Sequence, residues 1–150
     1  FSPNLQYAAL QQAFPGGVSS KSITPQGLID VVCKIRSSKL PDPKILANAG
    51  SFFKNPVVEL PLFEQLKSRY PDIVNYPAEG GVKLAAGWLI ERTGLKGYRE
   101  GDLAMYEKQA LVLVNYGESN ADALLQFAGH VQQAVLDQFS IQLEIEPLLL

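Results

Sequence analysis

The segment "NAGSFFKNPVV", residues 48–58, places Ser51 between a glycine and two phenylalanines. Lys54 and Asn55 follow directly behind them. A buried strand has a use for the phenylalanines and valines, and much less for the polar residues interleaved among them. Ser51 is therefore either a turn residue or a reactive hydroxyl.

Other residues that commonly carry chemistry are scarce. The chain has one histidine and one cysteine, and no spacing typical of a phosphate loop, a dinucleotide-binding turn or a metal cluster. His130 lies off the apolar stripe of its expected helix, which predicts a solvated side chain and not the base of a serine triad. Cys33 lies among Val31, Val32 and Ile35, which predicts a small buried hydrophobic side chain. We expect no metal site.

A set of polar residues along the chain has two interpretations. Each residue alone is a solvated side chain. Taken together they are suited to a cationic, hydrogen-bonding cradle for a phosphorylated ligand. The set consists of Lys39, Lys44, Lys54, Asn55, Tyr76, Lys83 and Lys96.

Length and composition are those of one globular domain: 150 residues, 47% hydrophobic and 19% charged. The net charge of −2 gives no global field that would attract nucleic acid or an anionic membrane. A single cysteine fits a reducing compartment, and no apolar run approaches the roughly 20 residues of a membrane span. The first residue is Phe1, so we expect a piece of a longer chain.

Hydrophobic spacing predicts an α+β fold with a mixed sheet, in a single domain. A helix is expected to begin at Thr24-Pro25 and to end before Pro41, and a later one to be capped by Ser119 with Asp122. Further helices are expected over 61–70 and 83–93, and strands over 51–58, 109–115 and 140–146. Residues 1–22 are expected to form a connecting segment, and residues 23–150 the domain.

The run "RSSKLPDPKILANAGSFFKNPVV", residues 36–58, resembles the UDP-N-acetylenolpyruvoylglucosamine reductases. The motifs "NYP", "GGVKLAAGWLIE", "LKG" and "QALVLVN" follow in the order of that family, and "LEIE" is similar to its C-terminal glutamate segment. The resemblance covers residues 24–146. It implies the C-terminal, substrate-binding part of an enzyme whose FAD-binding part comes first.

The resemblance also implies the chemistry. NADPH reduces FAD, and the flavin passes a hydride to UDP-N-acetylglucosamine enolpyruvate, which becomes UDP-N-acetylmuramate for the bacterial cell wall, in the cytoplasm. Ser51 is implied as the general acid that protonates the inner carbon of the enolpyruvyl group. Without the FAD-binding part, residues 1–150 are expected to be inactive.

The roles of further residues follow from the same resemblance. Lys39 and Asn55 are expected to meet the diphosphate or the sugar, and Tyr76 to pack on the uracil. Lys96 and Gln109 are expected to hold phosphate, and Arg36 to serve the flavin or the pyrophosphate.

The C-terminal motif departs from the family pattern, because Ile145 replaces the usual proline of Leu-Glu-Pro-Glu. Counting from Phe139 assigns the catalytic carboxylate to Glu146 instead of Glu144. The alternative interpretation of the whole chain is a stand-alone module that binds a nucleotide sugar without redox chemistry.

Overall fold

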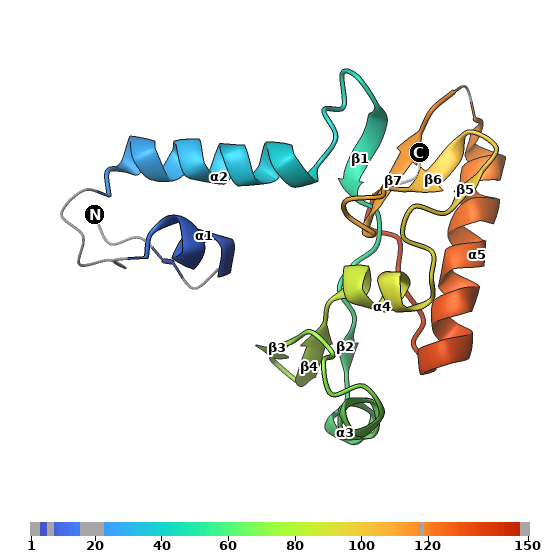
Figure 1. The fold of residues 1–150 in the computed structure, drawn as a ribbon. Coiled ribbons are helices and arrows are strands. Elements are labelled where there is room, and N and C mark those ends of the chain that lie inside the picture. The colour runs from blue at the N-terminus through green and yellow to red at the C-terminus, as the bar shows by residue number, and fades with distance from the viewer. Residues whose placement is uncertain (1–3, 6–7, 16–22, 118, 148–150) are drawn as a thin grey trace. The chain divides into compact units, whose positions relative to one another are not determined.

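The computed structural model describes residues 4–5, 8–15, 23–117 and 119–147. Contacts divide the chain into two units, residues 1–41 and 42–150 (Figure 1). Of the expected connecting segment 1–22, residues 16–22 lie outside the described residues, while helix α1 (Ala8–Ala13) falls within it. The boundary expected at residue 23 stays a prediction.

Helix α2 (Pro25–Lys39) begins and ends where proline chemistry predicts. The Thr24 hydroxyl oxygen accepts a hydrogen bond of 3.0 Å from the Gly27 N–H, and Pro25 opens the first turn. Leu40 is extended, as expected of a residue that precedes proline. Both predicted ends of the helix are confirmed.

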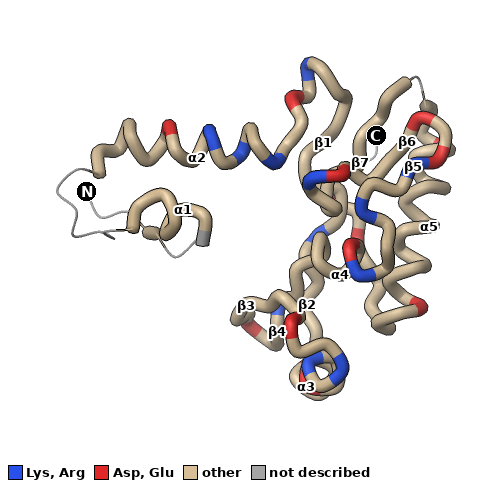
Figure 2. The backbone as a smooth tube through the Cα atoms, viewed as in Figure 1, with Lys and Arg blue, Asp and Glu red and all other residues tan. Residues whose placement is uncertain are grey.

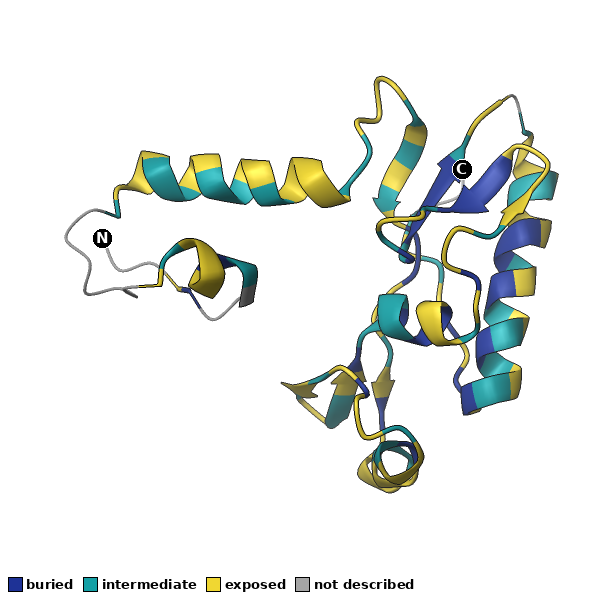
Figure 3. Ribbon diagram, in the orientation of Figure 1, coloured by how far each residue is buried: buried dark blue, intermediate teal, exposed yellow. Residues whose placement is uncertain are grey.

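The prediction of a buried Cys33 is wrong. Cys33 is exposed, and none of the residues of α2 is buried (Figure 3). The reason is the lack of a second layer, since α1 is the one other described element of this unit. An apolar stripe predicts burial only when an element is present to cover it.

The second unit contains a four-stranded antiparallel sheet packed against the longest helix. The strands lie in the order β1 (Ala47–Ser51), β7 (Val112–Asn115), β6 (Leu103–Met105), β5 (Arg99–Glu100). Helix α5 (Ala121–Phe139) turns its buried side to this sheet (Figures 1 and 3). Phe127, Val131 and Val135 of α5 share one core with Leu103 and Leu113.

A smaller antiparallel sheet has the order β2 (Val57–Val58), β4 (Gly81–Leu84), β3 (Asn75–Ala78). Helix α3 (Leu60–Arg69) contributes the buried Leu66 and confirms the helix expected over 61–70. Gly81 marks a close approach of two strands, because a Cβ built on it would lie 2.2 Å from the Val58 carbonyl oxygen. No residue with a side chain fits there without moving β2 away from β4.

Two expected elements have different bounds in the structure. The strand expected over 51–58 is β1 and β2 with a break between them, because Pro56 cannot donate to a ladder. The helix expected over 83–93 begins later, as α4 (Ala86–Arg92), because Lys83 and Leu84 pair in β4. It ends as predicted at Gly94, whose φ of 81° is left-handed.

Apolar and polar residues alternate over 140–146 in the sequence, and burial follows this alternation, but the expected strand does not form. Ile141 and Leu143 are buried and Ile145 is half-buried. Residues 140–146 nevertheless form one isolated bridge, between Ile145 and Phe53, in place of a ladder. The cap of α5 is also different, because Asn120 and not Ser119 accepts the Ala123 N–H, at 2.9 Å.

The α+β class is confirmed. Every ladder between the described strands is antiparallel, so two antiparallel sheets stand where one mixed sheet was expected. Strand β7 starts at Val112, three residues after the expected start, because residues 106–112 form hydrogen-bonded turns. No described helix has both the length and the apolar character that crossing a membrane requires.

The close approach at Gly81 gives a prediction about stability. Gly81→Ala should lower the free energy of unfolding by about 1–3 kcal/mol, the usual range for overpacking. Gly129→Ala is the matched control, because a Cβ on Gly129 in α5 meets nothing within 4 Å. It should stabilise by up to about 1 kcal/mol through helix propensity. Urea unfolding followed by the fluorescence of the single tryptophan, Trp88, measures both. Equal midpoints for Gly81→Ala and the parent would contradict the close approach.

Candidate functional site

Ser51 lies at the end of β1, directly after an irregularity in the strand. The pairing of β1 with β7 shifts register between Asn48 and Ser51, and Gly50 has a φ of 75°. The Asn48 side chain accepts a 3.0 Å hydrogen bond from the Gly50 N–H, which fixes this turn. Bulges of this kind re-aim the residue that follows them. Ser51 is exposed, whereas the two phenylalanines after it are 3% and 0% exposed.

The C-terminal segment lies antiparallel to residues 52–54. The Glu146 N–H donates to the Phe52 carbonyl at 2.9 Å, and the Lys54 N–H donates to the Glu144 carbonyl at 2.9 Å. The bridge between Phe53 and Ile145 sits between these two bonds. This register sets Glu146 opposite Phe52, one residue from Ser51.

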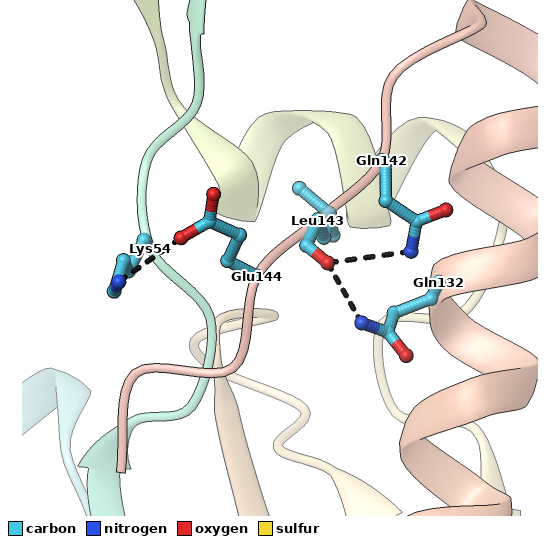
Figure 4. A network of polar contacts seen from close by, with 5 residues as sticks. All are labelled: Lys54, Gln132, Gln142, Leu143 and Glu144. Atoms are coloured by element: carbon cyan, nitrogen blue, oxygen red, sulfur yellow. Dashed lines mark hydrogen bonds and ion pairs between the residues drawn. The ribbon is translucent and has the colours of Figure 1, made fainter. Parts of the chain in front are cut away.

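The two glutamates of this segment differ in their contacts. Glu144 Oε2 lies 3.0 Å from Lys54 Nζ, and the two side chains point toward one another (Figure 4). The Glu146 carboxylate has no hydrogen bond or ion pair among the residues that the structure describes. Of the two, Glu146 is the one that could meet a ligand without breaking an ion pair.

Asn55 and Gln109 both bring an amide oxygen to the first turn of α4. The Ala86 N–H donates to Asn55 Oδ1 at 2.9 Å, and this bond caps the helix from 31 positions away in the sequence. Gln109 Oε1 lies 3.0 Å from the place of a Cβ on Gly87. Because the oxygen of Asn55 is engaged, its NH₂ group is the part that remains to meet a ligand.

Residues 51–55 form hydrogen bonds to the segments that carry the other polar residues of the site. Phe52 donates to the Leu111 carbonyl at 2.9 Å, close to Gln109 in the chain, and accepts from Glu146 on its other side. Asn55 reaches α4 at the end of the same segment. Ser51, Asn55 and Glu146 thus belong to two chain segments that pair with each other, and Gln109 lies two positions before Leu111, the partner of Phe52.

Tyr76 and Lys83 lie on the smaller sheet. They are cross-strand partners, and Val57 pairs with Lys83 on the opposite side, so the three residues form one row across the sheet. Cross-strand partners point to the same face. Tyr76 is 51% exposed and Val57 49%, so this row presents an aromatic ring and a cation to solvent.

The other predicted binding residues lie on other elements. Lys96 follows α4 and pairs with Glu91 at 2.8 Å. Arg36 and Lys39 belong to the last turn of α2 in the unit of residues 1–41, where positive charge suits the helix C-terminus (Figure 2). Their roles toward a ligand stay predictions.

His130 is a surface residue, as predicted. Its side chain is 48% exposed, with Nδ1 3.7 Å from Glu100 Oε2. The ring packs edge-on against Tyr98, with centroids 5.3 Å apart. Burial raises the pKa of the Tyr98 hydroxyl above its usual value, and the negative charge of nearby Glu100 raises it further by a smaller amount. The described residues hold no group of three or more potential metal ligands.

Residues 42–150 match a family model for the C-terminal domain of a reductase. That family is UDP-N-acetylenolpyruvoylglucosamine reductase, and the chain belongs to it, which confirms the resemblance. The reductase of Pseudomonas syringae pv. tomato is 52% identical over 125 residues, which are 83% of this chain and 37% of that protein. The reductase of Pseudomonas fluorescens is 48% identical over 148 residues, 96% of this chain and 42% of that protein.

The chain thus spans about two fifths of the length of these relatives. Among solved structures, UDP-N-acetylenolpyruvylglucosamine reductase from Thermus caldophilus is 26% identical, with a TM-score of 0.46. That match covers 81% of this chain and 33% of the other.

The contact between Asn55 and α4 gives a second prediction. Asn55→Ala should lower the free energy of unfolding by about 1 kcal/mol, because the Ala86 N–H loses its acceptor. Asn55→Asp keeps an acceptor oxygen there, so its stability should stay within about 0.5 kcal/mol of the parent. Chemical unfolding of the three proteins in parallel measures this difference. Equal losses in both variants would show that the oxygen of Asn55 does not cap α4.

Proposed function

We propose that this chain is the substrate-binding and proton-donating part of an NADPH-using flavoenzyme. That enzyme converts UDP-N-acetylglucosamine enolpyruvate to UDP-N-acetylmuramate, a precursor of peptidoglycan. The observation that carries the proposal is the backbone hydrogen bond between Glu146 and Phe52, which brings the backbone of Glu146 next to the residue that follows Ser51. The match of residues 42–150 to the C-terminal domain of the reductase supports it.

The reduction adds a hydride and a proton across the enolpyruvyl double bond. FAD, when bound and reduced by NADPH, supplies the hydride to the outer carbon. Ser51 gives its hydroxyl proton to the inner carbon, and the exposed serine then regains a proton from solvent. Glu146 polarises or protonates the enolate that develops on the substrate carboxyl group. The outer carbon ends as a methyl group and the inner carbon as a C–H.

Serine is a weak acid, so its placement has to compensate for its acidity. An enolate carbon is a strong base, and a donor held in contact with it needs no low pKa. The turn at Gly50 and the burial of Phe52 and Phe53 fix the backbone on both sides of Ser51.

The remaining residues are proposed to hold the UDP-sugar. Asn55 donates its NH₂ group to an oxygen of the diphosphate or the sugar, and Gln109 contacts a phosphate. Tyr76 stacks on the uracil. Lys96 exchanges its ion pair with Glu91 for one with a phosphate. The free-energy cost is small, since exposed ion pairs contribute about 0–1 kcal/mol. Lys39 joins them from α2.

The flavin is proposed to bind mainly to the part of the reductase that precedes this chain. Arg36 is the one described residue assigned to it. The Arg36 side chain is exposed in the last turn of α2, and a guanidinium suits a phosphate of FAD or of the substrate. We place the enzyme in the bacterial cytoplasm, where a reducing environment fits the free Cys33.

The rival proposal, a stand-alone module that binds a nucleotide sugar, needs Tyr76 and the lysines alone. It gives no reason for Ser51 and Glu146 to lie together. The relatives named as reductases, about half identical to this chain, favour the redox enzyme.

Replacement of Ser51 tests the proton transfer in the full-length reductase. In Ser51→Ala, NADPH should still reduce the flavin, while turnover of the enolpyruvyl substrate falls by about 10²-fold or more, the usual scale for a lost general acid. Ser68→Ala is the control, because Ser68 is an exposed serine of α3 that donates within its own helix. Stopped-flow absorbance separates the two half-reactions. Normal turnover by Ser51→Ala would show that Ser51 is a turn residue and not the proton donor.

The two glutamates can be told apart in the same enzyme. Glu146→Gln should slow single-turnover reoxidation of the flavin by substrate about 10²-fold or more, because the amide lacks the acidic proton that the carboxyl group gives to the enolate. Glu144→Gln removes the charge from an exposed ion pair, and the rate should change by less than about fivefold. A large loss confined to Glu144→Gln would reverse the assignment.

A further inference from the structure

Gln132, in the middle of α5, contacts the C-terminal segment through a hydrogen bond to its backbone. Gln132 Nε2 donates to the Leu143 carbonyl oxygen at 2.7 Å (Figure 4). Gln142 Nε2 reaches the same oxygen at 3.4 Å, which is long for such a bond. Leu143 is 1% exposed, so solvent offers this carbonyl little compensation if Gln132 is lost.

The carbonyl of Leu143 is one that the pairing with residues 52–54 does not use. Residues 144 and 146 turn their backbone groups toward that segment and bond to it. In extended chain, successive residues turn these groups in opposite directions, so the Leu143 carbonyl is directed away from residues 52–54 and toward α5. Residues 143–146 are therefore fixed from two sides, by the Ser51 segment and by α5.

We propose that Gln132 is a positioning residue for the carboxylate of Glu146, a role that rests on the proposed function. Gln132 acts through the backbone and is not itself placed at the substrate. Two residues separate Leu143 from Glu146, and the isolated bridge in this stretch gives it few other constraints. Loss of the anchor lets residues 143–146 shift relative to residues 51–54. Displacement of a catalytic group by about 1 Å can cost a hundredfold in rate.

A second, weaker anchor lies on the other side of the segment. Lys54 and Glu144 form an ion pair of 3.0 Å between side chains that are 56% and 71% exposed. Water screens such a pair, so Lys54 should hold the segment less firmly than the part-buried amide of Gln132 does. Loss of either anchor should let the segment shift, and loss of the Gln132 hydrogen bond should have the larger effect.

The first test measures the position of the segment without any catalysis. Gln132→Met removes the donor while keeping a long, helix-forming side chain. In the chain of residues 1–150, amide hydrogen exchange at Glu146 and Lys54 should become about tenfold faster or more. Exchange at Met105 and Val114, in the four-stranded sheet, should stay unchanged. The control is Gln133→Met, because Gln133 is an exposed neighbour that donates to Asp137 within α5.

The second test measures turnover in the full-length reductase. Gln132→Met should lower kcat about ten- to a hundredfold, with the KM for the enolpyruvyl substrate within about twofold and flavin reduction by NADPH unchanged. Lys54→Met should give a smaller loss of kcat. Gln133→Met should match the parent.

The outcomes separate this inference from the proposed function. Unchanged exchange at Glu146 in Gln132→Met overturns the positioning role, whatever the activity of the enzyme. A kcat equal to that of the parent in both Gln132→Met and Lys54→Met overturns it too. A parent enzyme that binds the enolpyruvyl substrate but never reduces it would refute the proposed function instead, and the exchange result would stand. If Gln132→Met does not fold, Gln132→Glu carries the test, because it keeps the length of the side chain and removes its amide donor.

Discussion

The antiparallel contact between residues 52–54 and residues 144–146 is the interaction on which the site depends. Two backbone hydrogen bonds of 2.9 Å and one bridge join parts of the chain that are about 90 residues apart. The rest of the second unit makes this contact possible. The four-stranded sheet supports Ser51 from β7, and α5 supports the opposite side through Leu143. Without this contact, Ser51 and Glu146 would be two unrelated surface residues.

Segment 51–55 also connects the stability of the domain with its proposed chemistry. Asn55 satisfies the first turn of α4 with its oxygen, and in the proposed function it offers its nitrogen to the ligand. The two ends of one amide thus serve the fold and the site. Leu89 and Ile90 of α4 belong to the hydrophobic core, so loss of the cap should also disturb the packing of the core. Stability and binding are not separable at this position.

The sequence predicted the residues that a local pattern determines. Proline and threonine marked both ends of α2, and the apolar stripe of α5 and the alternation after residue 140 were right. The contacts that a distant segment determines were not predictable. Nothing in the sequence pairs Asn55 with Ala86, or Gln132 with Leu143, because a glutamine or asparagine on a surface carries no periodic signal. The prediction for Cys33 was wrong for a related reason, since none of the described residues of its own unit buries that face of the helix.

Phe52 and Phe53 have a consequence for the alignment of Ser51 with Glu146. Both rings belong to one hydrophobic core and pack edge to face, with centroids 5.2 Å apart, while Ser51 before them and Lys54 after them are exposed. A slip by one residue would push the serine or the lysine into the interior and bring a phenylalanine into water. Exposure of one such ring costs about 1.5–3 kcal/mol, and burial of a charged lysine costs more. Hydrophobic burial thus prevents a slip of a whole residue in segment 51–54, and the polar anchors of residues 143–146 have only smaller shifts to prevent.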